Sequence, residues 1–139
     1  MAAFDTPLHI EFMDGRVYKL LTAFTYHTEV GTLVSVTVPA GFLTDFASIP
    51  RGAWNIVPKR GKHDKPAVMH DAGYRGQLLD VFGEPVQLTR KQTDNLFLEA
   101  MKVSGVSKFH QQVMYRAVRF FGGRSYMDKR EPIAPGIKN

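Results

Sequence analysis

The stretch DKPAVMHDAGY, residues 64–74, decides how the second half of this chain folds. Its first residue, an aspartate, is suited to cap a helix, and its proline then stands in the first helical turn. The residues that follow are mostly apolar, so we expect a helix that is at least half buried and ends at about Tyr74. His70 and Asp71 lie at the middle of this helix, where neighbouring side chains point about 100° apart. They can therefore reach two different targets from one scaffold.

Two further helices are predicted by their capping signals. Thr89 and Gln92 have the spacing of a capping box, which predicts a helix that begins there and stops at Gly105. Ser107 is suited to cap a third helix, which we expect to end near residues 121–123, Phe-Gly-Gly. The apolar stripe expected on this third helix consists of Val113, Met114, Ala117, Val118 and Phe121.

The first half of the chain has the alternation of β-strands. Residues 9–12 and 17–20 alternate between apolar and polar, and Asp14-Gly15 between them is a strong signal for a two-residue hairpin turn. Residues 33–38 predict a half-buried strand. The side chains expected on one face of this strand are Val34, Val36 and Val38.

Strands followed by helices indicate an α+β fold, with N-terminal antiparallel strands that include a hairpin and then about three helices. A chain of 139 residues and 15.6 kDa has the size of a single domain. We assign residues 1–127 to this domain. Residues 128–139, with two prolines and one glycine, are assigned to an extended basic tail.

The composition excludes several classes of protein. The sequence has no Cys, which excludes disulfides and thiolate chemistry, and no apolar stretch of the roughly 20 residues that a membrane span needs. Its first residues lack the basic and apolar regions of a signal peptide, so we expect synthesis in the cytoplasm. No organic cofactor is expected.

The net charge of +5 resides in residues 108–139, which carry seven basic and two acidic residues. This excess fits a solvated helix face with a basic tail, or an anionic partner. Nucleic acid is disfavoured as that partner, because the basic residues are not interleaved with exposed aromatic residues.

Four polar residues do not suit an apolar core, namely Asp45, His70, Asp71 and Asp94. Together they supply one imidazole and three carboxylates from separate elements. This set suits either a divalent cation with bound water, calcium or zinc, or a His general base oriented by an Asp. His63 lies seven residues before His70, about two helical turns away, and is a minor candidate for the same site.

Each of these residues also has a structural interpretation. Asp45 follows a strand and suits an Asx-turn or a helix cap. Asp94 lies near the first turn of its helix, where an acid interacts favourably with the helix dipole. His70 suits a hydrogen-bonded core position. The sequence leaves these interpretations open beside the functional ones.

The segments VPAGFLTDFASIPRGAW, AVMHDAGYRG, TRKQTDNLFLEAMKVSGV and VMYRAVRFFGG resemble the phage and prophage family catalogued as domain of unknown function 1353. The resemblance covers roughly residues 35–123 and rests on the combination of Asp45, His70-Asp71 and Asp94. It implies an origin in a tailed phage or prophage, with synthesis in the cytoplasm of a bacterial host. It implies no particular activity.

The order His70-Asp71-x-x-Tyr74, followed by Asp94 on a later helix, is also similar to the motif of the secreted and parvoviral phospholipases A2. In that family a His activates water, the next residue, an Asp, binds calcium, and a distant Asp orients the His. The resemblance implies that His70 is the base, Asp71 a calcium ligand, Asp94 the orienting carboxylate and Tyr74 a supporting residue. Asp45 is the second candidate metal ligand.

Two functions therefore compete. The first is a metal-dependent hydrolase that acts on a component of the host envelope, either a lipid ester or a peptidoglycan peptide. The alternative is a non-catalytic virion component, a tail or baseplate subunit, whose polar residues form a buried network. In that case the basic C-terminal segment docks on other phage structural proteins.

Overall fold

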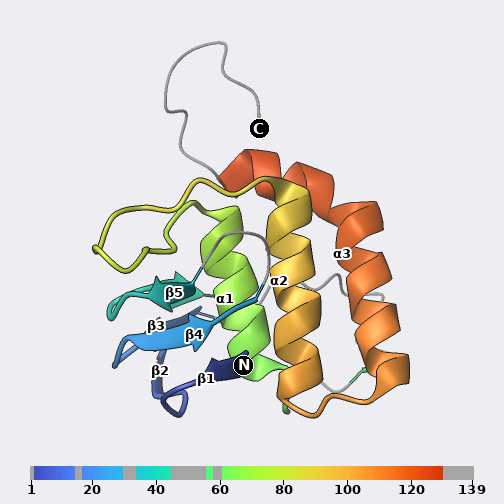
Figure 1. Cartoon of the computed structure of the whole chain (residues 1–139), viewed down its shortest axis with the longest axis horizontal. Helices are drawn as coiled ribbons and strands as arrows, with labels where there is room; N and C mark the ends of the chain where they lie inside the picture. The colour runs from blue at the N-terminus through green and yellow to red at the C-terminus, as the bar shows by residue number, and fades with distance from the viewer. Residues whose placement is uncertain (1, 15–16, 30–33, 45–55, 58–60, 130–139) are drawn as a thin grey trace.

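The computed structural model describes residues 2–14, 17–29, 34–44, 56–57 and 61–129, and of residues 124, 125 and 127–129 it describes the backbone alone. In this part of the chain, short strands are followed by longer helices (Figure 1), which confirms the predicted α+β fold. The strands are β1 (Ala3–Phe4), β2 (Ile10–Asp14), β3 (Val17–Leu20), β4 (Phe24–His27), β5 (Ser35–Val38) and β6 (Leu43–Thr44). The helices are α1 (Asp64–Tyr74), α2 (Arg90–Val103) and α3 (Lys108–Lys129).

The strands form two small antiparallel sheets, with the orders β1-β4-β5 and β2-β3-β6. The predicted hairpin is confirmed, because β2 pairs with β3 with Ile10 opposite Leu20. Its two turn residues, 15 and 16, lie outside the described residues. β3 then pairs with β6, with Tyr18 opposite Thr44. This pairing places Thr44 at the sheet edge that faces α1, since β6 contacts that helix.

The strand predicted near residue 34 is present as β5, and its pattern is partly as expected. Val36 and Val38 are buried against the core. The prediction for Val34 was wrong, because this side chain is 69% exposed. The strand begins only at Ser35, so Val34 lies before the ladder that pairs β5 with β4 and is not held against the core.

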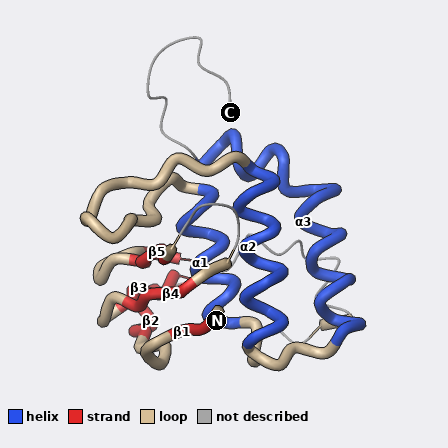
Figure 2. The backbone as a smooth tube through the Cα atoms, viewed as in Figure 1, coloured by secondary structure: helices blue, strands red, loops and turns tan. Residues whose placement is uncertain are grey.

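Helix α1 lies at the centre of the domain. It contacts α2, α3, β5 and β6, and Figure 2 shows it between the strands and the other helices. Every residue from Pro66 to Tyr74 is buried. A helix that is covered on all sides is expected to lack an amphipathic pattern, because it has no face toward water. The two polar residues at its middle are therefore both enclosed by protein.

The predicted helix starts at α2 and α3 are confirmed. The prediction that Asp64 caps α1 was wrong, because His63 is the N-cap and Asp64 is the first residue of the helix. Thr89 and Gln92 form the expected capping box at the start of α2. Gly105 has a φ of +82°, a left-handed conformation that favours glycine, and it follows the end of α2 as predicted. The Ser107 hydroxyl accepts a hydrogen bond from the backbone N–H of His110, 3.2 Å away, at the start of α3. These starts were predictable because the signals are local.

The predicted end of the third helix was wrong. Helix α3 continues past residues 121–123 to Lys129, and its last turns lie across the ends of α1 and α2 (Figure 1). Tyr126 is buried there and donates a hydrogen bond to the Leu88 carbonyl, 2.8 Å away. This tertiary packing holds the helix together beyond the glycine pair. Phe121, predicted to be in the apolar stripe, is 66% exposed instead.

Gly122 allows α3 to approach α1 closely. A Cβ atom at this position would lie 2.7 Å from the hydroxyl of Tyr74, which is fully buried and cannot move aside. The neighbouring Gly123 has more room, since the nearest atom to its Cβ position is 3.8 Å away, on Arg90. The two glycines therefore differ in what they tolerate, although they are adjacent in one helix.

We expect Gly122→Ala to lower the free energy of unfolding by about 1–3 kcal/mol, because the added methyl group overpacks the contact with Tyr74. Gly123→Ala is the matched control. It should leave the stability unchanged or raise it by about 0.5–1 kcal/mol, because Ala is the better helix former. Urea unfolding of both variants measures the difference. Equal stabilities for the two variants would contradict the close contact.

Candidate active site

The carboxylate of Asp94 is the centre of a buried network that joins the helices. Its Oδ1 atom lies 2.6 Å from Nε2 of His70 and accepts a hydrogen bond from the Tyr74 hydroxyl at 2.6 Å. Its Oδ2 atom accepts a hydrogen bond from the Arg119 guanidinium at 2.7 Å. Asp94 belongs to α2, His70 and Tyr74 to α1, and Arg119 to α3. The network therefore depends on the packing of all these helices.

Local sequence explains how α1 contributes two partners to one carboxylate. His70 and Tyr74 are four residues apart, so their side chains lie on the same face of the helix. Their rings pack against each other with centroids 4.1 Å apart, and the imidazole also packs against Phe97 of α2 at 4.7 Å. These contacts fix the plane of the imidazole ring. The predicted association of His70, Tyr74 and Asp94 is present.

Burial and hydrogen bonding act in opposite directions on Asp94. Its side chain has no exposed surface, and burial alone raises its pKa. The hydrogen bond and charge of His70, with the hydrogen bonds of Tyr74 and Arg119, outweigh this effect and bring the pKa below the ordinary value of 3.8. Asp94 is thus an ionised carboxylate inside the core, and the Arg119 guanidinium balances its charge.

The other end of the imidazole has a different environment. The Nδ1 atom of His70 is buried and has no hydrogen-bond partner among the described residues. The ionised Asp94 accepts the hydrogen of Nε2, so Nδ1 is the ring nitrogen that remains for a second hydrogen bond. Burial and the Asp94 hydrogen bond both raise the pKa of Tyr74, which therefore stays a neutral donor. The imidazole of His70 is thus oriented through Nε2, with Nδ1 directed away from the carboxylate.

Asp71 has its own set of partners. Its Oδ2 atom accepts a hydrogen bond from the Thr44 hydroxyl at 2.7 Å, and its Oδ1 atom accepts one from Nε of Arg75 at 3.2 Å. Thr44 comes from β6, so this contact joins the sheet to α1. Asp71 and His70 point to different targets, as the helical geometry predicted. The structure therefore places Asp71 beside the Asp94 network but outside it.

The remaining predicted residues do not join this network in the described structure. Asp45 lies outside the described residues. His63 is buried at the N-cap of α1, about 10 Å along the helix from His70 by helical rise. It lines a separate small pocket together with His110.

The described residues do not form a recognisable metal centre. Among them, no group of three or more His, Cys, Asp or Glu side chains lies close enough together to hold a cation. Asp71 offers one carboxylate, and both its oxygens already accept hydrogen bonds, one of them from a guanidinium. A cation at Asp71 would lie beside the Arg75 guanidinium, whose positive charge disfavours it. The assignment of Asp71 and Asp45 as metal ligands stays a prediction.

Sequence reasoning missed Arg119, Thr44 and Arg75. Arg75 could have been found, because an Asp followed by an Arg four residues later is a favourable pair on a helix. Arg119 and Thr44 reach their partners across 25 and 27 residues, and no local pattern indicates such contacts. These two contacts follow from the packing of α3 and β6 against the rest of the fold.

Comparisons with known proteins give one family and one uncharacterised relative. A family model described as "Protein of unknown function (DUF1353)" matches residues 18–118, which include His70, Asp71, Tyr74 and Asp94. The chain is also similar to "Uncharacterized protein y4jT" of Sinorhizobium fredii (strain NBRC 101917 / NGR234), with 33% identity over 108 residues. That alignment covers 76% of this chain and 29% of the relative, so the chain spans less than a third of the relative's length. No solved structure matches the chain.

No helix in the described residues is long and apolar enough to cross a membrane.

The ionised Asp94 should make stability depend on pH in acid. Its pKa in the unfolded chain is the ordinary value of 3.8, and its pKa in the folded protein is lower. The stabilisation is therefore fully present above this value and is lost as the pH falls through the folded pKa. Asp94→Asn should lower the free energy of unfolding by about 3–5 kcal/mol at neutral pH, because the Arg119 guanidinium then lacks the opposite charge.

Urea unfolding from neutral pH to below 3.8 tests this expectation. The difference in stability between the unaltered chain and Asp94→Asn should narrow below that pH. Glu84→Gln, a change at an exposed carboxylate, is the control and should stay within about 0.5 kcal/mol of the unaltered chain. A difference that stays constant over the whole range would show that Asp94 does not act as a buried charge.

Proposed function

Since the chain belongs to the DUF1353 family of proteins of unknown function, we propose its function from the chemistry of the buried site. The proposal is a hydrolase in which His70 is the general base. One observation carries it: the imidazole is oriented through Nε2 by Asp94, while its buried Nδ1 has no hydrogen-bond partner among the described residues. A buried acceptor without a partner needs a donor, and a water molecule is the simplest one.

Such a water becomes the nucleophile. His70 Nδ1 takes a proton as the water oxygen forms a bond to the carbonyl carbon of an ester or amide. The carbonyl then re-forms, the bond to the leaving group breaks, and the imidazolium returns its proton to the leaving oxygen or nitrogen. The positive charge that His70 carries in between is stabilised by Asp94, 2.6 Å away.

The other residues of the network position this base. Tyr74 and Arg119 donate hydrogen bonds to Asp94, so both oxygens of the carboxylate are held in place. The ring contacts with Tyr74 and Phe97 hold the imidazole plane. This preorganisation lets the base act without first paying for a change of geometry.

The substrate class that we propose is a component of a bacterial envelope, either a lipid ester or a peptidoglycan peptide. The order His70-Asp71-x-x-Tyr74 with the distant Asp94 is similar to that of phospholipases A2, which supports the lipid ester. The resemblance to phage and prophage proteins supports an origin in a phage that must act on its host envelope. In that setting the partners are the host envelope and other phage proteins.

The proposal includes a divalent cation only as an ion that Asp71 and Asp45 would bind. When bound there, calcium or zinc would stabilise the oxyanion that forms at the carbonyl oxygen. The proton transfers described above do not depend on it. His70, Asp94, Tyr74 and Arg119 supply them from this chain alone.

We expect His70→Gln to lower hydrolysis by roughly 100-fold or more, because the general base is lost. The substrates are vesicles of bacterial phospholipids and purified peptidoglycan, and released products are identified by mass spectrometry. His9→Gln, a change at an exposed His, is the matched control and should keep full activity. Release of the same product at the same rate by His70→Gln would exclude His70 as the base. No release by the unaltered chain from either material would exclude both substrate classes.

Calorimetric titration of calcium and of zinc into chelator-treated protein tests the cation separately. If Asp71 is a ligand, the unaltered chain binds one of these ions and Asp71→Asn binds it at least about tenfold more weakly, because a charged ligand is lost. Equal binding by both proteins places the cation elsewhere. The absence of any binding heat removes the cation from the proposal and leaves the His70 base in place.

A specific observation also favours the non-catalytic alternative, a tail or baseplate subunit. The side chains of His70 and Asp94 have no exposed surface, which suits a network that fixes the fold. The alternative predicts that the protein is present in purified virions and that His70→Gln changes stability but not any hydrolysis. Mass spectrometry of virions, together with the activity assay, separates the two functions.

A further inference from the structure

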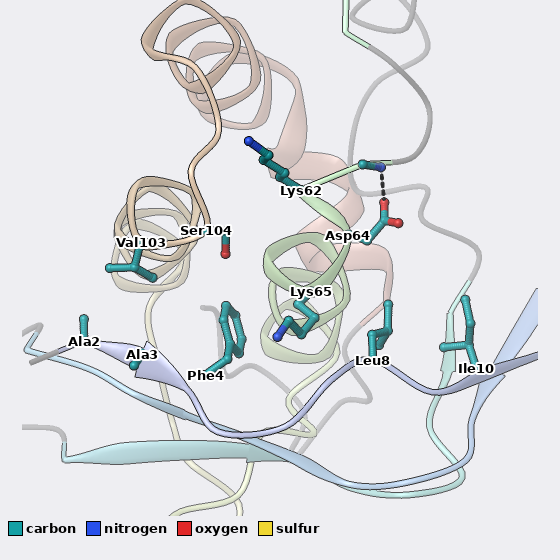
Figure 3. Close-up of a pocket in the computed structure, with 11 residues that line it drawn as sticks. Ala2, Ala3, Phe4, Leu8, Ile10, Lys62, Asp64, Lys65, Val103 and Ser104 are labelled. Carbon is teal, nitrogen blue, oxygen red and sulfur yellow. Dashed lines mark hydrogen bonds between the residues drawn. The ribbon is translucent and has the colours of Figure 1, made fainter.

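A groove lies at the opposite end of α1 from the Asp94 network. Its volume is about 930 Å³, within the range of small-molecule sites. It is lined by β1, the segment that leads into β2, the start of α1 and the end of α2 (Figure 3). The apolar side chains that line it are Ala2, Ala3, Phe4, Leu8, Ile10 and Val103. The charged side chains that line it are Lys62, Asp64 and Lys65, and Asp64 accepts a hydrogen bond from the backbone N–H of Gly61. An elongated apolar ligand therefore fits this surface better than a compact polar one.

A positively charged side chain, that of Lys62, lies where this groove meets a second, smaller pocket. Lys62 lines both cavities, and Figure 3 shows its side chain pointing away from Phe4 and Leu8. Its Nζ atom is 3.7 Å from the position that a Cβ would occupy at Gly105. Among the described residues, no carboxylate forms an ion pair with it. Lys65, in contrast, is engaged, because it donates to the Thr6 carbonyl at 3.1 Å and lies over the Phe4 ring.

The smaller pocket, of about 240 Å³, adds donors beside this cation. It is lined by the buried His63 and by His110, whose partly buried imidazole can donate an N–H group to an anion. Lys62 is shared with the apolar groove, so a charged group in the pocket and an apolar chain in the groove can belong to one molecule. His63 therefore lines a pocket that is separate from the His70 site.

We propose that this composite site binds a single-chain amphiphile with an anionic head group. The chain lies along Phe4, Leu8 and Ile10, and the phosphate or carboxylate lies at Lys62 between His63 and His110. This inference goes beyond the proposed hydrolase, because His63 and Lys62 are about 10 Å or more along the helix axis from His70. Binding here does not require His70 and Asp94 to be catalytically active.

Calorimetric titration with dodecyl phosphate, below its micelle concentration, tests the site. The unaltered chain should bind it saturably. Lys62→Gln should bind it about tenfold more weakly or worse, because a hydrogen bond to a charged group is lost. Lys91→Gln, a change at an exposed lysine of α2, is the matched control and should bind like the unaltered chain. Val103→Asp should also weaken binding, since it places a carboxylate beside the apolar chain.

Three further ligands separate the contributions of head and chain. Dodecyl maltoside has the same chain with a neutral head and should bind at least about tenfold more weakly than dodecyl phosphate. Inorganic phosphate should not bind measurably without the chain. Dodecanoate distinguishes a carboxylate from a phosphate as the preferred head group. The inference is overturned if dodecyl phosphate does not bind saturably, if Lys62→Gln binds as tightly as the unaltered chain, or if the maltoside binds as well as the phosphate.

Discussion

The buried charge of Asp94 is the constraint on which the rest of the structure depends. An isolated carboxylate inside a protein costs several kcal/mol, so the chain must surround it with donors. It does so with His70 and Tyr74 from α1 and Arg119 from α3. The helices can therefore not be packed in another order or rotation without leaving this charge unpaired. The candidate catalytic pair, His70 and Asp94, is therefore also the contact that holds the three helices together.

Helix α1 connects this centre to the sheets. Because neighbouring residues on a helix point about 100° apart, His70 reaches α2 while Asp71 reaches Thr44 of β6. Neither residue could be polar in a fully buried helix unless its partner were in place. The hydrogen bonds of these two adjacent side chains therefore depend both on the pairing of β6 with β3 and on the packing of α2.

Much of the local structure was predictable, and the reason is that its signals are short in sequence. The hairpin between β2 and β3, the capping box at Thr89 and the stop at Gly105 each depend on a few neighbouring residues. The spacing placed Tyr74 one turn after His70, and the association of Asp94 with them was implied by the resemblance to a known motif. Arg119 was missed because its contact with Asp94 joins two helices, and the end of α3 was wrong because Tyr126 packs against the rest of the fold. Such contacts depend on tertiary structure that no local pattern records.

The turn at Gly105 has a consequence for the electrostatics of the site. It sets where α3 begins, and Arg119 lies eleven residues after the first residue of that helix, about 16 Å further along its axis. One residue inserted or deleted between Lys108 and Arg119 would turn the following side chains by about 100° around the axis of α3 and aim the guanidinium elsewhere. The turn at Gly105 thus fixes the residue from which this spacing is counted, at the start of α3. Length changes within α3 before Arg119 would therefore leave the buried Asp94 carboxylate without its guanidinium partner.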